Sequence, residues 1–285
     1  MTDNALAFDR QSATSRGLAQ AIENARCVAI CGIPGVGKSV LVRELMLLAV
    51  AARRGVHLLQ WDVARLPFDQ PAILDRYPEI DNVTHPILRR SAGLWARTAI
   101  AAWFKRHADP NHLLVIEAPL VGNRFMELAR PASDEAEPHL AAAATQFLVP
   151  IPTCEVRAAI ERARANDSRD RPHVLNAKDA PPALVDALWR QVLSAAEAFR
   201  LPNYSVSFDY APSVYRDVYR RVLRHRHLIT LSIEEVIRVP QSAHELPAPL
   251  SRLVPNVAEV ERWIQAVESE GVANAVSRDR DWFKV

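Results

Sequence analysis

The sequence has few cysteines, and the positions of those few exclude a protein built around disulfides. Only three of the 285 residues are cysteine. Cys27 and Cys31 lie four residues apart on one predicted strand, about 13 Å by strand rise, too far for a disulfide or a shared metal ion. Cys154 stands alone. We therefore expect a reduced, cytoplasmic protein whose cysteines belong to the core.

The sequence also lacks long apolar runs and an excess of either charge. No segment reaches the roughly 18 apolar residues that a membrane span needs, and the first residues do not show the basic-then-apolar pattern of a secretory signal. The 35 basic and 33 acidic residues leave a net charge of +2, which argues against a general attraction to nucleic acid or to a membrane. We expect a soluble globular protein; nothing in the pattern specifies its oligomeric state.

The most specific feature that is present is the phosphate-binding pattern G-x-x-x-x-G-K-[ST] at residues 32–39. The short apolar run 28–30 precedes it, as a buried parallel strand would. Residues 40–53 follow with an apolar stripe at helical spacing, and Gly55 is expected to cap that helix. Glycines allow successive backbone N–H groups to turn toward a phosphate, and the helix start adds partial positive charge.

These residues predict a site for ATP and Mg²⁺. Lys38 is expected to bridge the β- and γ-phosphates, and the Ser39 hydroxyl is expected to bind Mg²⁺. The expected nucleotide contacts are Gly32, Gly35, Val36, Gly37, Lys38, Ser39 and Val40.

Predicted strands and helices alternate over residues 26–200, which indicates an α/β fold with a parallel sheet covered by helices on both faces. We assign a P-loop nucleotide-binding domain to residues 14–200 and a small C-terminal α+β extension to residues 201–285. Within the extension, Asn256 and Glu259 have the spacing of a helix capping box. Ligands of such sheets bind at the carboxyl ends of the strands.

Two carboxylates are expected at that edge. Asp62 follows the second predicted strand and would accept the proton of an acceptor hydroxyl, or orient that hydroxyl. A helix N-cap or loop carboxylate is the alternative for Asp62. Glu117 ends the third predicted strand and would hold Mg²⁺ through coordinated water, unless it pairs with a nearby basic side chain.

Arginines cluster in and after the predicted helix 155–166. One or two of them, with Arg162 and Arg169 favoured, would neutralise charge on the transferred phosphoryl group. The alternative is a solvated, salt-bridged helix face, because acidic residues are interleaved with the arginines.

Other arginines precede this cluster. Arg124, near the start of a helix expected at residues 122–130, is a candidate for holding the acceptor or a phosphate. Arg89 and Arg90 open a long predicted helix; surface positions are expected for both, and the alternative is that they also hold the acceptor or a phosphate.

The strand ends also exclude related nucleotide-binding classes. The third strand is followed by Ala118 and Pro119, without the Asp-x-x-Gly of a GTPase, and it lacks the Asp-Glu pair of AAA-type ATPases.

The P-loop, Asp62, the strand end at Glu117, Arg124 and the arginine-rich helix together resemble the nucleoside and nucleotide kinases, and uridine kinases most. In uridine kinases a glycine follows the strand-end carboxylate, where this chain has Ala118. The resemblance covers residues 26–200 and implies Mg²⁺-dependent transfer of the γ-phosphate of ATP to a hydroxyl of a small molecule. The alternative function is an ATP-hydrolysing switch that acts on a macromolecular partner through residues 201–285.

Overall fold

The computed structural model describes residues 9, 11–80, 83–170, 182–202, 209–236 and 251–285. The strands are β1 (Cys27–Cys31), β2 (Gly55–Gln60), β3 (His112–Ala118), β4 (Thr145–Pro152), β5 (His227–Ile233) and β6 (Ser251–Arg252). The helices are α1 (Ala13–Glu23), α2 (Lys38–Ala51), α3 (Trp61–Ala64), α4 (Pro71–Arg76), α5 (Pro86–Arg106), α6 (Glu137–Leu140), α7 (Cys154–Asp170), α8 (Pro182–Ala198), α9 (Pro212–Val222), α10 (Val257–Ser269) and α11 (Val272–Arg280). Two short 3₁₀ helices are η2 (Leu66–Asp69) and η3 (Met126–Leu128).

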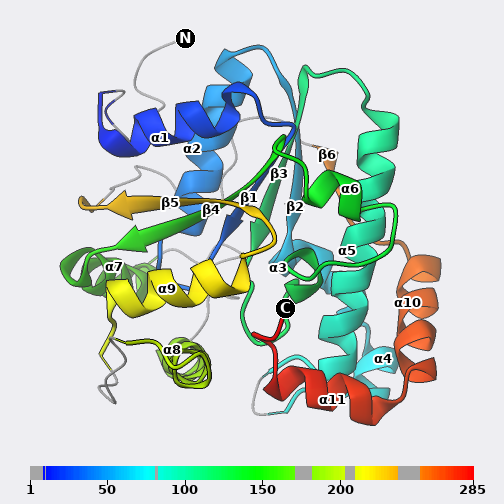
Figure 1. Ribbon diagram of the computed structural model, residues 1–285. Helices are drawn as coiled ribbons and strands as arrows, with labels where there is room; N and C mark the ends of the chain where they lie inside the picture. The colour runs from blue at the N-terminus through cyan, green and yellow to red at the C-terminus, as the bar shows by residue number, and fades with distance from the viewer. Residues whose placement is uncertain (1–8, 10, 81–82, 171–181, 203–208, 237–250) are drawn as a thin grey trace.

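The strands form one sheet in the order β5-β4-β1-β3-β2-β6, and every neighbouring pair is parallel (Figure 1). This confirms the expected α/β fold with a parallel sheet. Both outer strands, β5 and β6, come from residues 201–285, so the predicted extension adds to the same sheet. Within it, the expected capping box opens α10, where the Asn256 side chain accepts from the Glu259 N–H.

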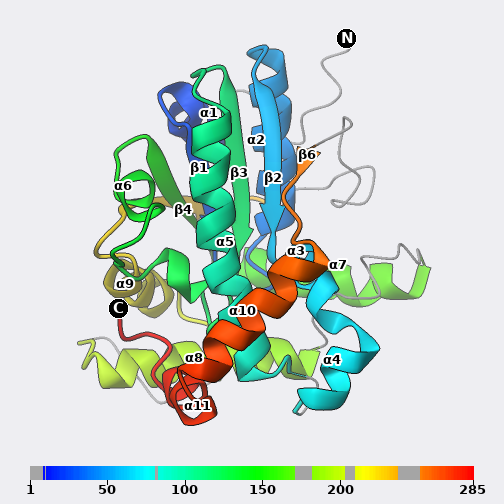
Figure 2. The same cartoon turned by 90° about the vertical axis from the view of Figure 1, so that its right-hand side faces the viewer.

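Alternate residues of β1 point to opposite faces of the sheet, and each face is covered by helices. Val28 and Ile30 pack with apolar residues of α1 and α2, whereas Cys27, Ala29 and Cys31 belong to the core beneath α5 and α9. Figure 2 shows α5 and α10 in front of the sheet and α1 and α2 behind it. Cys27 and Cys31 are buried free thiols, as expected of core cysteines, whereas Cys154 is exposed at the start of α7, so the expectation is wrong for that residue. None of the described helices is both long and apolar enough to cross a bilayer.

Arg89 and Arg90 are buried, so the prediction that they lie at the surface is wrong. Both point from α5 toward acidic residues at the C-terminal end of the chain. Arg89 pairs with Asp279 of α11 at 2.8 Å, and Arg90 Nε donates to Glu270 at 3.0 Å. A buried charge is costly unless it is paired, and these contacts fasten the chain around α10 and α11 to α5.

Two local predictions are also wrong. Gly55 is the first residue of β2, and Arg53 takes the left-handed conformation after α2, with φ of 58°. Residues 122–130 do not begin a helix. Left-handed backbone at Gly122, Asn123 and Phe125 interrupts them, and only η3 follows.

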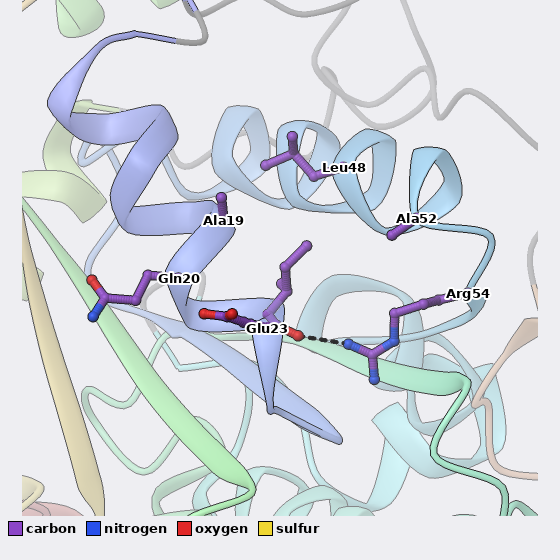
Figure 3. A pocket seen from close by; sticks show the side chains of 7 residues that line it. Ala19, Gln20, Glu23, Leu48, Ala52 and Arg54 are labelled. Carbon is purple, nitrogen blue, oxygen red and sulfur yellow. Dashed lines mark hydrogen bonds between the residues drawn. The ribbon is translucent and has the colours of Figure 1, made fainter.

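A shallow hollow lies between α1 and α2 (Figure 3), lined by Ala19, Gln20, Ile22, Glu23, Leu48, Ala52 and Arg54. Arg54 Nη1 donates to the Ile22 carbonyl across it at 2.7 Å. Because Ala52 caps the C-terminal end of α2, this hollow is distant from the predicted phosphate-binding loop at the other end of that helix.

Candidate functional site

The loop at residues 32–37 joins β1 to α2, as the pattern predicts, and its glycines have backbone angles that other residues resist. Gly35 and Gly37 have φ of 83° and 87°, and Gly37 is the N-cap of α2. Gly32 has φ of 140°, and a Cβ there would collide with the Tyr215 hydroxyl of α9. The loop therefore has the glycine conformations with which backbone N–H groups form an anion-binding cradle.

Lys38 and Ser39 are the first two residues of α2, and Val40 follows them in its first turn. The Lys38 ammonium donates to the Ile33 carbonyl at 3.1 Å, so it lies over the loop. Val36 is fully buried and anchors the loop to the core. The predicted nucleotide contacts are thus gathered at one helix N-terminus.

Two polar contacts at this edge meet on the carboxylate of Glu117. The Ser39 hydroxyl donates to Glu117 Oε1 at 3.0 Å, and Gln60 Nε2 donates to Glu117 Oε2 at 2.8 Å. The register explains both contacts: Glu117 lies opposite Ile30 of β1 and opposite Gln60 of β2. A hydroxyl and a buried carboxylate at this separation supply the hard oxygen donors that Mg²⁺ prefers.

Gln60 was not among the predicted site residues. Its position near the end of the second strand, two residues before Asp62, was visible in the sequence, but the register that places it opposite Glu117 was not. Its amide orients one Glu117 oxygen and leaves the other to Ser39.

Asp62 lies in the first turn of α3, directly after β2, and its side chain is exposed. Burial and Arg89 lower the pKa of Arg124, and Asp62, after Asp279, is one of the weaker influences that raise it. Asp62 therefore acts on Arg124 through its charge, and both residues were predicted on the acceptor side.

Arg124 is buried in a loop with an unusual backbone. Leu120, Asn123 and Phe125 have φ of 45°, 59° and 60°, values that non-glycine residues adopt at a cost. Burial first, and then the neighbouring Arg89, lower the pKa of Arg124 to about 10, so its guanidinium remains charged at neutral pH.

Within the described part of the chain, Arg124 Nη1 has no hydrogen-bond partner, and neither does Oε1 of Gln191 from α8. The two atoms lie on the same side of Gly122: a Cβ on that glycine would be 2.9 Å from Arg124 Nη1 and would collide with Gln191 Oε1. A buried donor and a buried acceptor without partners are expected to bind something polar.

The arginines of α7 are arranged differently from the expectation. Arg162 is exposed, and the side chain of Arg169 lies outside the described residues. Arg157 is instead the buried arginine. Its Nε donates to Glu161 at 2.8 Å, its guanidinium lies 4.4 Å from the Tyr210 ring centroid, and its Nη1 has no partner among the described residues. Arg157 belonged to the predicted cluster but was not favoured within it.

Helix α7 lies against the glycine loop at residues 32–37. A Cβ on Gly35 would be 3.5 Å from Glu161 Oε1, and a Cβ on Gly37 would be 3.9 Å from Ile160 Cδ1. Helices α3, α7, α8 and α9 gather at this end of the sheet (Figures 1 and 2). A ligand on this loop would therefore have α7 beside it.

Comparison with models of known protein families gives no match, and comparison with curated protein sequences gives none either.

Proposed function

We propose that this protein is an ATP-dependent phosphotransferase that moves the γ-phosphate of ATP to a hydroxyl of a small molecule. The observation that supports this most strongly is the 3.0 Å contact between Ser39 and Glu117, directly after a loop with left-handed glycines. In this assignment the loop N–H groups and Lys38 bind the phosphates of ATP.

The donor set fits Mg²⁺, which binds oxygen ligands and keeps several of its waters. Ser39 would bind the ion through its hydroxyl and Glu117 through a water, and Gln60 would hold the Glu117 carboxylate in place. The ion supplies charge neutralisation to the phosphates.

The acceptor side is the reason to favour a transferase over a hydrolase. Hydrolysis requires only a positioned water, whereas this edge also has Nη1 of the buried Arg124 and Oε1 of Gln191, neither of which has a hydrogen-bond partner among the residues that the structure describes. A guanidinium binds phosphate or carboxylate groups strongly. We therefore assign Arg124 and Gln191 to a small polar acceptor with an anionic group, and Asp62 to its reacting hydroxyl.

The second candidate is a nucleotide-driven switch, and one observation favours it. Tyr215 of α9 is fully buried, with its hydroxyl directly against Gly32 of the P-loop, and the Tyr219 hydroxyl donates to the Pro119 carbonyl at 2.9 Å. A change at the P-loop would therefore be transmitted to α9, which belongs to residues 201–285.

An acceptor screen separates the two functions. Purified protein is incubated with Mg²⁺·ATP and pools of nucleosides, sugars, vitamins and amino sugars, with phosphorylated derivatives included, and is analysed by mass spectrometry. A transferase yields ADP and a phosphorylated product in equal amounts. Lys38→Ala is the control that must lose this activity. ATP hydrolysis that is unaffected by every small molecule but stimulated by a macromolecule would replace the transferase by the switch.

A further inference from the structure

Three histidines lie together at the end of the sheet away from the P-loop. His57 is the third residue of β2, His107 caps the C-terminus of α5, and His112 is the first residue of β3. In Figure 2 the end of α5 and the beginnings of β2 and β3 meet at the end of the sheet opposite α3. The proposed ATP site is at the other edge, so this cluster needs a separate explanation.

One ring nitrogen of each histidine lies within 4.8 Å of one from each of the other two. His57 Nε2 and His112 Nδ1 are 3.1 Å apart. For a tetrahedral zinc ion with Zn–N bonds of about 2.0–2.1 Å, ligand nitrogens are about 3.4 Å apart. The His57–His112 pair is slightly closer than this, and the His107 nitrogen lies within 4.8 Å of both, so the rings must adjust to surround an ion.

The surroundings leave room for the rings and hold them in place. A Cβ on Gly55 would be 2.6 Å from His112 Nδ1, so a side chain at that position would displace the ring. The Trp103 ring packs edge-on against His57 at 5.6 Å. Arg26 donates to the His107 carbonyl, and the His107 N–H donates to the Trp103 carbonyl at 2.9 Å, so the backbone at His107 is fixed from two sides.

We propose that His57, His107 and His112 bind a divalent zinc ion, with the fourth ligand position open to solvent. His57 is buried, whereas His107 and His112 are half-buried, so the open position faces outward. The bound ion would join the ends of β2, β3 and α5. Such a site is independent of the proposed phosphotransfer.

The chemistry of the cluster selects the kind of ion. The ligands are imidazole nitrogens, which suit Zn²⁺ and neighbouring transition metals, and not the oxygen donors that Mg²⁺ and Ca²⁺ require. The nearby charge is positive, because Arg26 and Arg106 both act on His107. A cation held by charge alone would be repelled there, so binding requires coordinate bonds.

The test measures zinc binding to metal-stripped protein by calorimetry. The parent is Cys154→Ser, because Cys154 is an exposed thiol that could bind zinc by itself. Excess Mg²⁺ in the buffer keeps zinc from the Ser39–Glu117 site. We expect one zinc ion per chain, unaffected by Mg²⁺ or Ca²⁺. Removal of an orienting partner outside the ligand shell costs about 10–100-fold in affinity, so His57→Gln or His107→Gln should cost about 100-fold or more.

His139→Gln is the matched control, since His139 stacks on Phe104 outside the cluster. It should bind zinc as the parent does. Cobalt substitution gives a second measurement, in which the visible bands of a nitrogen-ligated Co²⁺ should appear in the parent and be absent from His107→Gln. If His57→Gln does not fold, His107→Gln at the helix end decides the question. A parent that binds no zinc, or equal binding by the parent and His107→Gln, would overturn the proposal.

Discussion

Glu117→Gln tests the proposed metal site without knowledge of the acceptor. The substitution keeps the shape of the side chain and removes its charge. Glu117 now accepts hydrogen bonds from Ser39 at 3.0 Å and from Gln60 at 2.8 Å. A glutamine can keep both contacts, because its oxygen can accept from Gln60 while its amide donates to the Ser39 hydroxyl. The fold should therefore be preserved, and the change is confined to the negative charge.

The expected magnitude follows from the contact that the metal would lose. In the proposed complex the carboxylate accepts a charge-assisted hydrogen bond from a water on Mg²⁺, and such a bond contributes about 1.5–3 kcal/mol. That range corresponds to about a 10- to 150-fold loss in the affinity for Mg²⁺·ATP. ATP without metal should bind the variant at least as well as the parent, because a negative charge near the phosphates has been removed.

Calorimetric titration of ATP in EDTA and in Mg²⁺ measures the gain in affinity that the metal provides. Glu197→Gln on α8, an exposed carboxylate, controls for the change in net charge and should keep the full gain. An equal gain from Mg²⁺ in the parent and in Glu117→Gln would show that Glu117 does not act at a metal site. Ser39 would then be without a carboxylate beside it at the proposed Mg²⁺ site.

Three further predictions concern the acceptor side and the core. Asp62→Asn should lower the rate of phosphoryl transfer by about 10²–10⁴-fold and leave the affinity for ATP unchanged. Asp75→Asn, at an exposed residue of α4, is the control and should have no effect. Near-normal transfer by Asp62→Asn would show that Asp62 is not the base. Arg124→Lys keeps the charge but loses the planar guanidinium, which can donate two hydrogen bonds to one anionic group. In steady-state kinetics, KM for the acceptor should therefore rise more than KM for ATP. A rise in KM for ATP alone would indicate that Arg124 binds the nucleotide. Gly93→Ala should lower the thermal unfolding midpoint although alanine favours helix by about 1 kcal/mol, because the new Cβ would collide with the buried Glu127 carboxylate. Thr98→Ala, exposed on the same helix, should not lower it. A gain in stability from Gly93→Ala would show that Glu127 does not pack against Gly93.

The sequence predicts best those features that depend on neighbouring residues. The strand, the glycine loop and the helix around Lys38 are encoded in one continuous stretch. The capping box that the sequence predicts at Asn256 and Glu259 is present. In each of these cases the groups that satisfy the backbone are within a few residues, so the pattern alone is sufficient.

The failures concern residues whose partners are distant in the chain. Arg89 and Arg90 look like surface residues because the carboxylates that pair with them, Asp279 and Glu270, lie 190 and 180 residues away. Gln60 has no marked pattern and becomes part of the site only through the register of β2 with β3. Neither relation can be inferred before the order of the strands and the course of the chain after residue 200 are known.

The loop between β3 and η3, at the proposed acceptor side, also depends on residues that are distant in the chain. Left-handed backbone at Leu120, Asn123 and Phe125 is unfavourable in isolation, at about 1–2 kcal/mol for each residue. Surrounding contacts hold it: Phe125 packs edge-on against Trp61 at 5.1 Å, the Tyr219 hydroxyl donates to the Pro119 carbonyl, and Arg130 donates to the Asn123 side chain.

The helix predicted at residues 122–130 would have avoided this backbone cost. In the conformation that the chain adopts instead, the Arg124 guanidinium is buried beside Gly122 and Gln191, with Nη1 unpaired among the described residues. Backbone strain of this kind persists only where the surrounding structure enforces it, and it concentrates at binding sites. Two unfavourable features therefore occur at Arg124: the strained backbone of its loop, and a buried Nη1 without a partner among the described residues. An anionic group on the acceptor would bind that Nη1 and offset the cost of burying it.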